Sequence, residues 1–93
     1  EPAADLAIVA AIWSSLSGVA ISADIAIFGE IGLGGEVRPV VGSALRVAEA
    51  DKLGFASVIS PPVNRQARGR VDGDLLHHVV RVDAAIERLR NGA

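Results

Sequence analysis

The chain of 93 residues contains no cysteine and no tyrosine. Without cysteine, disulfide bonds, zinc–thiolate sites and thiol catalysis are all excluded, and the composition fits an intracellular protein. With no tyrosine, two phenylalanines and one tryptophan, few side chains are left on which single-stranded bases could stack. Any function of this chain must therefore do without thiol chemistry and with very little aromatic surface.

Lysine is nearly absent as well: the chain has eight arginines and a single lysine, Lys52. A Walker A phosphate loop needs glycine followed by Lys and then Ser or Thr, and Lys52 lies far from the glycine-rich part of the chain. The net charge of −2 argues against a chain that binds polyanions over its whole surface. No apolar run approaches about 20 residues and no cleavable leader is visible, so we expect a cytoplasmic protein without a membrane anchor.

The most informative stretch is the glycine-rich run FGEIGLGGEVRPV at residues 28–40. Each glycine in a helix interior costs about 1 kcal/mol relative to alanine, so the run is a poor helix. Glycine supplies the positive φ of tight turns, so the run is typical of two strands joined by a turn. A dinucleotide-binding fingerprint is excluded by spacing, since Gly32 and Gly34 are followed by Val37 where the third glycine would stand.

Hydrophobic periodicity predicts an α+β domain with the order helix, hairpin, helix, strand, loop, strand, helix. The predicted helices cover residues 3–17 and 44–53 and a segment that starts at Asp83. The predicted strands cover residues 25–31, 36–40, 55–59 and 78–82, and a polar loop covers 63–74. A sheet of so few short strands needs further strands or other elements packed against it. We therefore expect residues 1–93 to be one partial domain, the second part of a larger unit.

Local signals set the expected ends and faces of the helices. Gly18 is a natural stop for the first helix. Ser43 and Asp83 are predicted to cap the second and third helices with their side-chain oxygens. In the second helix, Leu45, with Ala48 and Val47, is expected to point inward.

Most candidate catalytic residues have a simpler structural explanation. None of the seven serines lies in a Gly-x-Ser-x-Gly elbow, and helix-end roles account for most of them. His77 and His78 point to opposite faces of a strand, so they cannot hold one metal together, and no metal site is expected. Glu30 and Glu36 flank the turn and could form a carboxylate dyad, although solvent-facing carboxylates are far commoner.

The only basic cluster is Arg65, Arg68 and Arg70 in the predicted polar loop. These guanidinium groups could bind a nucleic-acid backbone through charge-assisted hydrogen bonds. Asp72 and Asp74 follow closely and weaken the positive potential. A solvated loop and a loop that contacts phosphate both remain open.

Three segments in combination resemble a known family. The segments are EPAADLA at residues 1–7, the glycine-rich run at 28–40, and KLGF at 52–55. They are similar to the C-terminal domain of the bacterial RadA (Sms) family, which itself resembles the proteolytic domain of Lon. The resemblance implies a Lon-like α+β fold (ribosomal protein S5 domain 2-like) that is incomplete at its N-terminal side.

The Lon resemblance assigns two catalytic positions. In Lon, the first helix starts with Gly-Pro-Ser-Ala-Gly and its serine is the nucleophile; the position corresponds to Ala3 here. The catalytic lysine, aligned through Pro39 and Gly54, corresponds to Ala44. Alanine offers neither an attacking oxygen nor an amine that accepts its proton. The resemblance therefore implies a protease fold without protease activity.

The RadA resemblance also implies a setting. Family members join a zinc finger, a RecA-type ATPase and this domain, and they drive branch migration in DNA repair. ATP, Mg and Zn would belong to those other parts, so no cofactor is expected in this chain. The expected role is a scaffold for a homo-oligomer, a hexameric ring, that contacts DNA through Arg65, Arg68 and Arg70. The alternatives are a Lon-type serine peptidase and the Lon-like domain of a magnesium-chelatase-type AAA ATPase.

Overall fold

The computed structural model describes residues 2–63 and 76–92 and confirms the expected mixed α and β domain, and its main sheet is parallel. The described part opens on a 3₁₀ turn, Pro2–Ala4. The helices and strands then follow in this order: α1 (Asp5–Ser17), β1 (Ile25–Ile27), β2 (Glu30–Ile31), β3 (Val37–Arg38), α2 (Ser43–Lys52), β4 (Ser57–Ser60), β5 (Leu76–His78) and α3 (Val82–Arg90).

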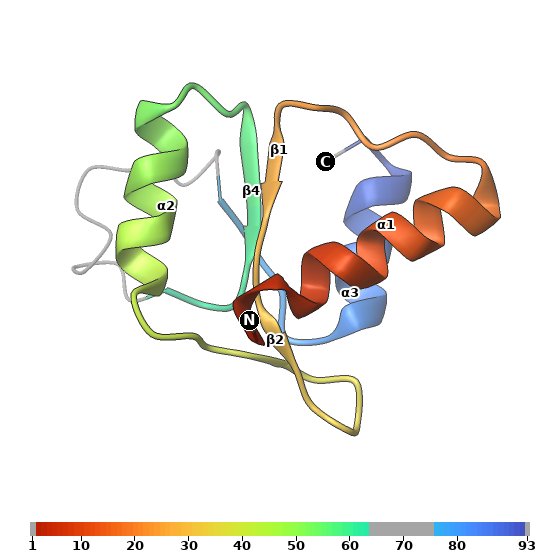
Figure 1. Ribbon diagram of the computed structural model, residues 1–93, viewed down its shortest axis with the longest axis horizontal. Coiled ribbons are helices and arrows are strands. Elements are labelled where there is room, and N and C mark those ends of the chain that lie inside the picture. Colours follow the sequence, from red (N-terminus) through yellow and green to blue (C-terminus); the bar gives the residue numbers. More distant parts are fainter. Residues whose placement is uncertain (1, 64–75, 93) are drawn as a thin grey trace.

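The strands form two separate units. A parallel sheet has the order β1–β4–β5, with Ile27 opposite Ile59 and Ile59 opposite His77. Strands β2 and β3 form the predicted antiparallel hairpin, with Ile31 opposite Val37. The hairpin projects beyond one end of the sheet, as Figure 1 shows. The sheet thus supplies a platform, and the glycine-rich run extends from it.

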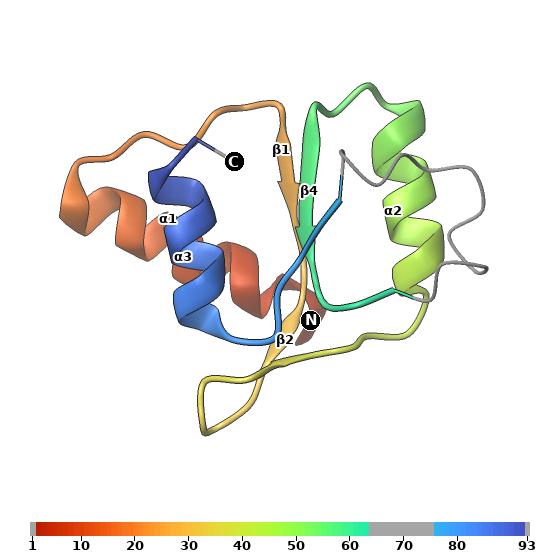
Figure 2. The ribbon, with the colours of Figure 1, turned by 180° about the vertical axis from the view of Figure 1, so that it is seen from behind.

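The helices cover both faces of the sheet. Helix α2 lies on one face, and α1 and α3 lie together on the other (Figures 1 and 2). Successive side chains of a strand point to opposite faces, so Val58 packs in the α2 layer and Ile59 in the α1–α3 layer. Both side chains are fully buried, which makes β4 the centre of the fold.

Helix α1 is apolar nearly all round. Leu6 and Ala10 are buried, and Trp13 packs against the same core, as its helical spacing predicts. Gly18 ends the helix in a left-handed conformation, φ 76°, with its N–H bonded to the Ser14 carbonyl. After Asp5 the helix carries no charged residue, and it exposes three large aliphatic side chains, Ile8, Ile12 and Leu16. In the described ranges no helix is long and apolar enough to cross a bilayer.

The predicted strand over 25–31 is divided at Gly29. Its φ of 155° is a positive value that L side chains rarely adopt. The Gly29 N–H donates to the Ala3 carbonyl at 2.9 Å, and the Gly29 carbonyl accepts from the Leu6 N–H at 3.0 Å. The segment after β1 therefore stops pairing with β4 at Phe28. It then bonds to the start of α1 through Gly29 and continues into the hairpin.

Two expectations for α2 are wrong. Ser43 is the first residue of the helix and Gly42 is its N-cap; the Ser43 hydroxyl donates to the Val40 carbonyl at 2.7 Å instead of capping. Leu45 is 65% exposed, and the buried positions are Val47 and Ala50. The three-residue spacing of this pair sets the face on the sheet, and Leu45 falls outside it.

The end of the chain also differs in detail from the expectation. Strand β5 ends at His78 instead of spanning 78–82, because the following backbone turns to pair with the hairpin: the Val37 N–H donates to the Val80 carbonyl at 2.9 Å. Helix α3 starts at Val82 with Arg81 as its N-cap, so the predicted cap position of Asp83 is wrong, but the Asp83 carboxylate accepts from the Ala84 N–H in the first turn at 2.9 Å. The predicted loop over 63–74 lies outside the described residues except for Val63, which is buried.

Replacing Gly29 with alanine is expected to destabilise the fold strongly. The added Cβ would lie 2.9 Å from Val37 Cγ1 and 3.4 Å from Pro61 Cδ. Overpacking of this kind costs about 1–3 kcal/mol, and the positive φ adds to it. Urea unfolding followed by the fluorescence of Trp13 measures the loss.

The matched control is Gly18→Ala, where φ is also positive but no atom lies within 4 Å of the new Cβ. That variant should lose only the conformational part, about 1 kcal/mol. Equal losses in the two variants would show that close packing at Gly29 is unimportant.

Candidate functional site

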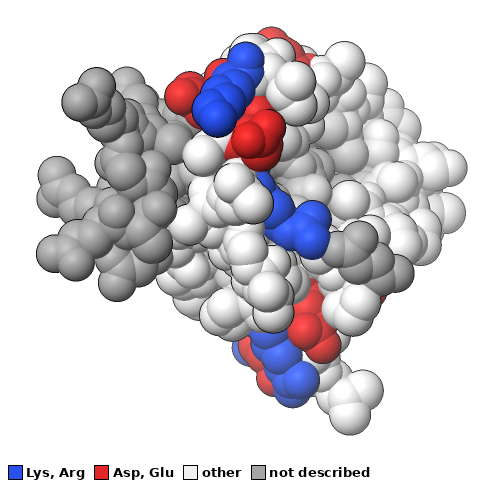
Figure 3. Space-filling model, turned by 60° about the vertical axis from the view of Figure 1, so that its left-hand side comes forward, with Lys and Arg blue, Asp and Glu red and all other residues white. Residues whose placement is uncertain are grey.

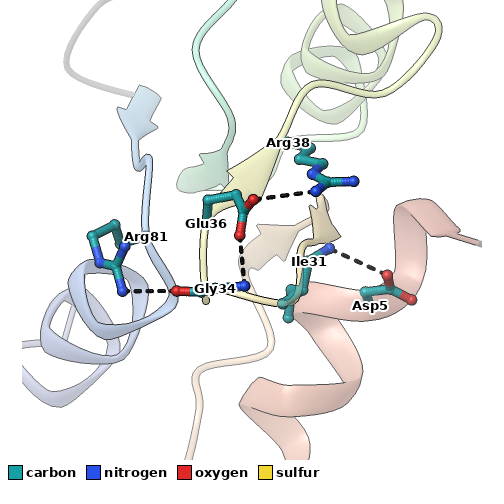
Figure 4. Close-up of polar contacts among 6 residues, drawn as sticks. All are labelled: Asp5, Ile31, Gly34, Glu36, Arg38 and Arg81. Atoms are coloured by element: carbon teal, nitrogen blue, oxygen red, sulfur yellow. Dashed lines mark hydrogen bonds and ion pairs between the residues drawn. The ribbon is translucent and has the colours of Figure 1, made fainter.

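The turn of the β2–β3 hairpin is built by glycines and closed by one carboxylate. The Gly35 N–H donates to the Gly32 carbonyl at 3.0 Å, with Gly35 at φ 83°. The Glu36 side chain folds back over the turn and accepts from the Gly34 N–H at 2.9 Å (Figure 4). It also pairs with the Arg38 guanidinium at 3.2 Å. Four consecutive residues of the turn are thereby held in one conformation.

These bonds change the acidity of Glu36. Its own backbone amide, the Arg38 side chain and the Gly34 N–H all stabilise the carboxylate, so the pKa of Glu36 lies below its ordinary value of 4.5. The Glu36 side chain is 42% exposed, and burial alone would raise its pKa, so the lowering comes from the local hydrogen bonds.

Two further hydrogen bonds join the turn to the start of α3. The Arg81 guanidinium donates to the Gly34 carbonyl at 3.0 Å, and the Val82 N–H donates to the Gly35 carbonyl at 2.9 Å. Figure 4 shows Arg81 reaching the turn from the α3 side while Arg38 approaches from the hairpin. The glycine-rich turn is thus anchored at the N-terminal end of α3.

The other end of the hairpin is anchored on α1. The Asp5 carboxylate accepts from the Ile31 N–H at 3.2 Å, which adds a side-chain bond to the two backbone bonds of Gly29. A carboxylate in the first turn of a helix is also favoured by the helix dipole. The start of α1 and strand β2 are therefore fixed against each other.

A pocket of about 260 Å³ lies beside this junction. Its lining residues among the described ranges are mostly apolar, with one carboxylate and one guanidinium: Pro2, Ala3, Glu30, Pro39, Val40, Val41 and Arg46. No hydroxyl, amine or imidazole side chain is among them. Ala3, the position of the Lon nucleophile by resemblance, is buried at its wall.

Ala44, the position of the Lon lysine by resemblance, is not one of the pocket's lining residues. It is partly buried and packs against the core under α2. The neighbouring Ser43 hydroxyl is bonded to the Val40 carbonyl. Ser60, another candidate nucleophile, is fully buried at the end of β4, and its hydroxyl donates to the Pro61 carbonyl at 2.9 Å. Both serines therefore have structural roles.

The carboxylate dyad proposed for the hairpin does not form. Glu30 stands opposite Arg38 in the β2–β3 register, and Glu36 lies one step beyond the paired residues. The Glu36 carboxylate pairs with Arg38 at 3.2 Å, and the Glu36 backbone forms an isolated antiparallel β-bridge with Arg81. Two like charges at 30 and 36 are thus kept apart by an arginine.

The two histidines give no metal site. His77 is half-buried and His78 is exposed, as expected for neighbours on a strand. Burial, and after it the charge of Arg88, lowers the pKa of His77 below its ordinary value of 6.5. Within residues 2–63 and 76–92, no group of three His, Asp or Glu side chains could hold a metal ion.

The predicted DNA-contacting residues Arg65, Arg68 and Arg70 lie outside the described residues. Elsewhere, most basic side chains have an acidic partner: Arg38 with Glu36, Lys52 with Glu49, Arg81 with Asp83, and Arg90 with Glu87. Figure 3 shows Lys and Arg interleaved with Asp and Glu on one face. The described surface in that view is therefore of mixed charge.

Comparison with known proteins identifies the family. The family model of the Lon protease (S16) C-terminal proteolytic domain matches residues 1–86. The chain therefore belongs to the family of Lon C-terminal proteolytic domains. Within that family, it is a RadA-like domain, as its curated relatives show.

Three of those relatives are DNA repair proteins called RadA. The protein of Aquifex aeolicus is 39% identical over 89 residues, which cover 96% of this chain and 19% of that protein. That of Brucella abortus is 49% identical over 61 residues, 66% of this chain and 13% of that protein. That of Escherichia coli is 45% identical over 64 residues, 69% and 14% respectively. The chain thus spans less than a fifth of these relatives.

The pKa of Glu36 should respond to Arg38 alone among the surface arginines. In an NMR titration, Arg38→Ala is expected to raise the Glu36 pKa towards 4.5, because an ion pair and hydrogen bond are lost. Arg90→Ala is the control, since Arg90 pairs with Glu87. An unchanged Glu36 pKa in Arg38→Ala would contradict the closed turn.

The same shift fixes the direction of a pH effect on stability. A carboxyl group whose pKa is lower in the folded state stabilises the fold above its unfolded pKa, and the contribution is lost as the pH falls through the folded value. Glu36→Gln should therefore reduce the acid dependence of the unfolding free energy below pH 4.5.

Proposed function

We propose that this chain is a non-catalytic domain that supports self-association and DNA contact in a RadA-type DNA repair protein. The proposal that the domain is non-catalytic rests on the pocket beside Ala3. The described lining of this pocket offers no nucleophile and no general base of the Ser–Lys type. With alanine at both 3 and 44, a covalent acyl intermediate has no atom on which to form. The domain keeps the fold of a peptidase without its reacting groups.

Self-association is supported by the amount of apolar surface that the described residues expose. Eight large aliphatic side chains are more than half exposed in the described ranges: Ile8, Ile12, Leu16, Leu33, Val41, Leu45, Leu53 and Val80. Ile8, Ile12 and Leu16 form one row along α1, and a contiguous apolar patch of this kind is typical of a contact with other protein. A ring of identical copies is the assembly we propose, with the parent protein supplying an ATPase.

The DNA contact is assigned to Arg65, Arg68 and Arg70. The described cations Arg38, Lys52, Arg81 and Arg90 each have an acidic neighbour, so their charge is largely compensated locally. The three clustered arginines provide a denser positive charge along the sequence. Phosphate contacts of this kind give affinity without base specificity.

Peptidase activity is expected to be absent. Incubation of the chain with unfolded casein and with fluorogenic peptides should release no more product than buffer, whereas an active Lon protease assayed in parallel should. Hydrolysis that a serine-directed inhibitor abolishes would overturn the non-catalytic assignment and favour a peptidase with a different nucleophile.

Replacing Arg65, Arg68 and Arg70 together by alanine is expected to weaken binding to duplex DNA. Each lost phosphate contact should reduce the slope of log affinity against log salt by about 1, so the triple variant should lose about 3. Fluorescence anisotropy at several salt concentrations measures the slope.

The control is a triple alanine variant of Lys52, Arg88 and Arg90, which removes the same charge at the ends of α2 and α3. It should retain most of the salt slope. An unchanged slope in the 65/68/70 variant, or equal losses in both variants, would remove these three arginines from the DNA interface.

A further inference from the structure

Helix α3 ends at an asparagine that is followed by a glycine, Asn91 and Gly92. The chain has one other asparagine, Asn64, and an arginine follows it. In an Asn-Gly pair the backbone nitrogen of the glycine can reach the side-chain amide carbon of the asparagine and close a five-membered ring, because glycine has no Cβ in the way. A side chain on the second residue hinders that approach. Asn91 is therefore the asparagine at which ring closure is expected.

The structure leaves both residues of this pair open to solvent. Asn91 and Gly92 are exposed, and a Cβ built on Gly92 would meet no atom within 4 Å. In the part of the chain that the structure describes, no hydrogen bond holds the Asn91 side-chain amide. Water and hydroxide can therefore reach both the attacking nitrogen and the amide that it attacks.

The hydrogen bonds of the helix end oppose the reaction. The Gly92 N–H donates to the Leu89 carbonyl at 3.2 Å, and the Asn91 N–H donates to the Glu87 carbonyl at 3.2 Å. Asn91 has ψ 3° and Gly92 has φ 84°. The Gly92 nitrogen can attack only after its bond to Leu89 opens and the Asn91 backbone leaves this conformation. Helix ends open at low cost, so these bonds slow the reaction without preventing it.

We propose that Asn91 is a site of spontaneous deamidation. The Gly92 nitrogen gives its proton to hydroxide and bonds to Cγ of Asn91, and the amide nitrogen takes a proton from water and leaves as ammonia. The product is a succinimide ring. Water then opens the ring at either carbonyl carbon, which gives aspartate in the normal backbone or isoaspartate, whose backbone runs through Cγ. One water is consumed and one ammonia is released, so the reaction needs no oxidant and no further reactant.

Either product places a negative charge at the residue that ends α3. The last carbonyls of the helix point towards the same position, and a carboxylate there is unfavourable with the helix dipole. In isoaspartate the backbone also gains a methylene group, so the bonds to the Glu87 and Leu89 carbonyls lose their geometry. Leu89 is buried in the α1–α3 layer. We therefore expect the modification to loosen α3 on the sheet.

The first test is ageing of the 93-residue chain in warm, mildly alkaline buffer, followed by peptide mapping and mass spectrometry. Aspartate and isoaspartate should both accumulate at position 91. A guanidinium-unfolded sample should react about fivefold faster, which converts to about 1 kcal/mol, the net value of one hydrogen bond. In that sample Asn64 should react far more slowly than Asn91. An unchanged Asn91 in the folded chain, or equal rates at the two asparagines in the unfolded chain, would overturn the proposal.

Two variants serve as matched controls for the chemistry. Gly92→Ala adds a Cβ that meets no atom in the folded chain but hinders ring closure, so its products should form severalfold more slowly. Asn91→Gln keeps an amide at the helix end but requires a six-membered ring, so it should stay almost unchanged over the same period. Deamidation at the parent rate in both variants would contradict the attack by the Gly92 nitrogen.

Thermal unfolding tests the effect on α3. Asn91→Asp supplies the charge without the backbone change and should melt below the parent chain. The aged parent chain, which also contains isoaspartate, should melt lower still. The reference is aged Asn91→Gln, because it carries any change elsewhere in the chain, such as isomerisation at Asp72-Gly73. Equal melting temperatures of the aged parent chain and aged Asn91→Gln would refute the loosening of α3.

Discussion

The backbone of Gly29 joins the parallel sheet, the hairpin and helix α1. Its N–H and carbonyl bond to Ala3 and Leu6, so the start of α1 is attached where strand β1 ends. Its Cα lies against Val37 of the hairpin and Pro61 after β4, with no room for a side chain. Sheet, hairpin and helix therefore converge on one position that only glycine can occupy without displacement.

The hairpin is held by the hydrogen bonds of Gly29 at its base and by the Arg81–Gly34 hydrogen bond at its turn. Asp5 holds the first strand to α1, and Arg81 holds the turn to α3, so the hairpin is fixed at both ends to helices on the same face of the sheet. A glycine-rich segment would otherwise be the most adaptable part of the chain. Here it becomes a stiff projection, which is a requirement for a surface that has to meet a partner in one orientation.

The pocket beside Ala3 owes its shape to the backbone and to apolar side chains. The walls come from backbone geometry and from Pro39 and Val40, none of which depends on a reacting group. Ala3 adds one more apolar side chain to these walls. The shape of this hollow is therefore independent of the side chain that a peptidase would need at position 3.

Local signals in the sequence were sufficient for the element order, the hairpin and the end of α1 at Gly18. They failed where distant residues decide the outcome. The break at Gly29 depends on Val37 and Pro61, and the Arg81–Gly34 bond joins residues 47 apart, so neither could be seen in a local pattern. In α2 the apolar residues are spread over several faces, so propensity could not choose Val47 over Leu45.

The candidate site was predictable only in part. The Lon resemblance placed Ala3, and the structure brings that residue to a pocket, whereas Ala44 lies in the core beside it. The turn carboxylate was expected to face Glu30, but the register puts Arg38 there. The available signal for the closed turn was a glutamate directly after Gly34-Gly35 and two residues before Arg38, a spacing that lets one carboxylate reach both a turn amide and a guanidinium.

Helix α1, with no charge after Asp5, gives the molecule two surfaces that respond differently to the solution. Added sodium chloride screens the ion pairs around the hairpin turn and leaves the aliphatic row of Ile8, Ile12 and Leu16 almost unaffected. Sulfate, which is excluded from protein surfaces, instead favours burial of that row. Chloride and sulfate therefore act on different sides of this domain, the first on its ion pairs and the second on its aliphatic row.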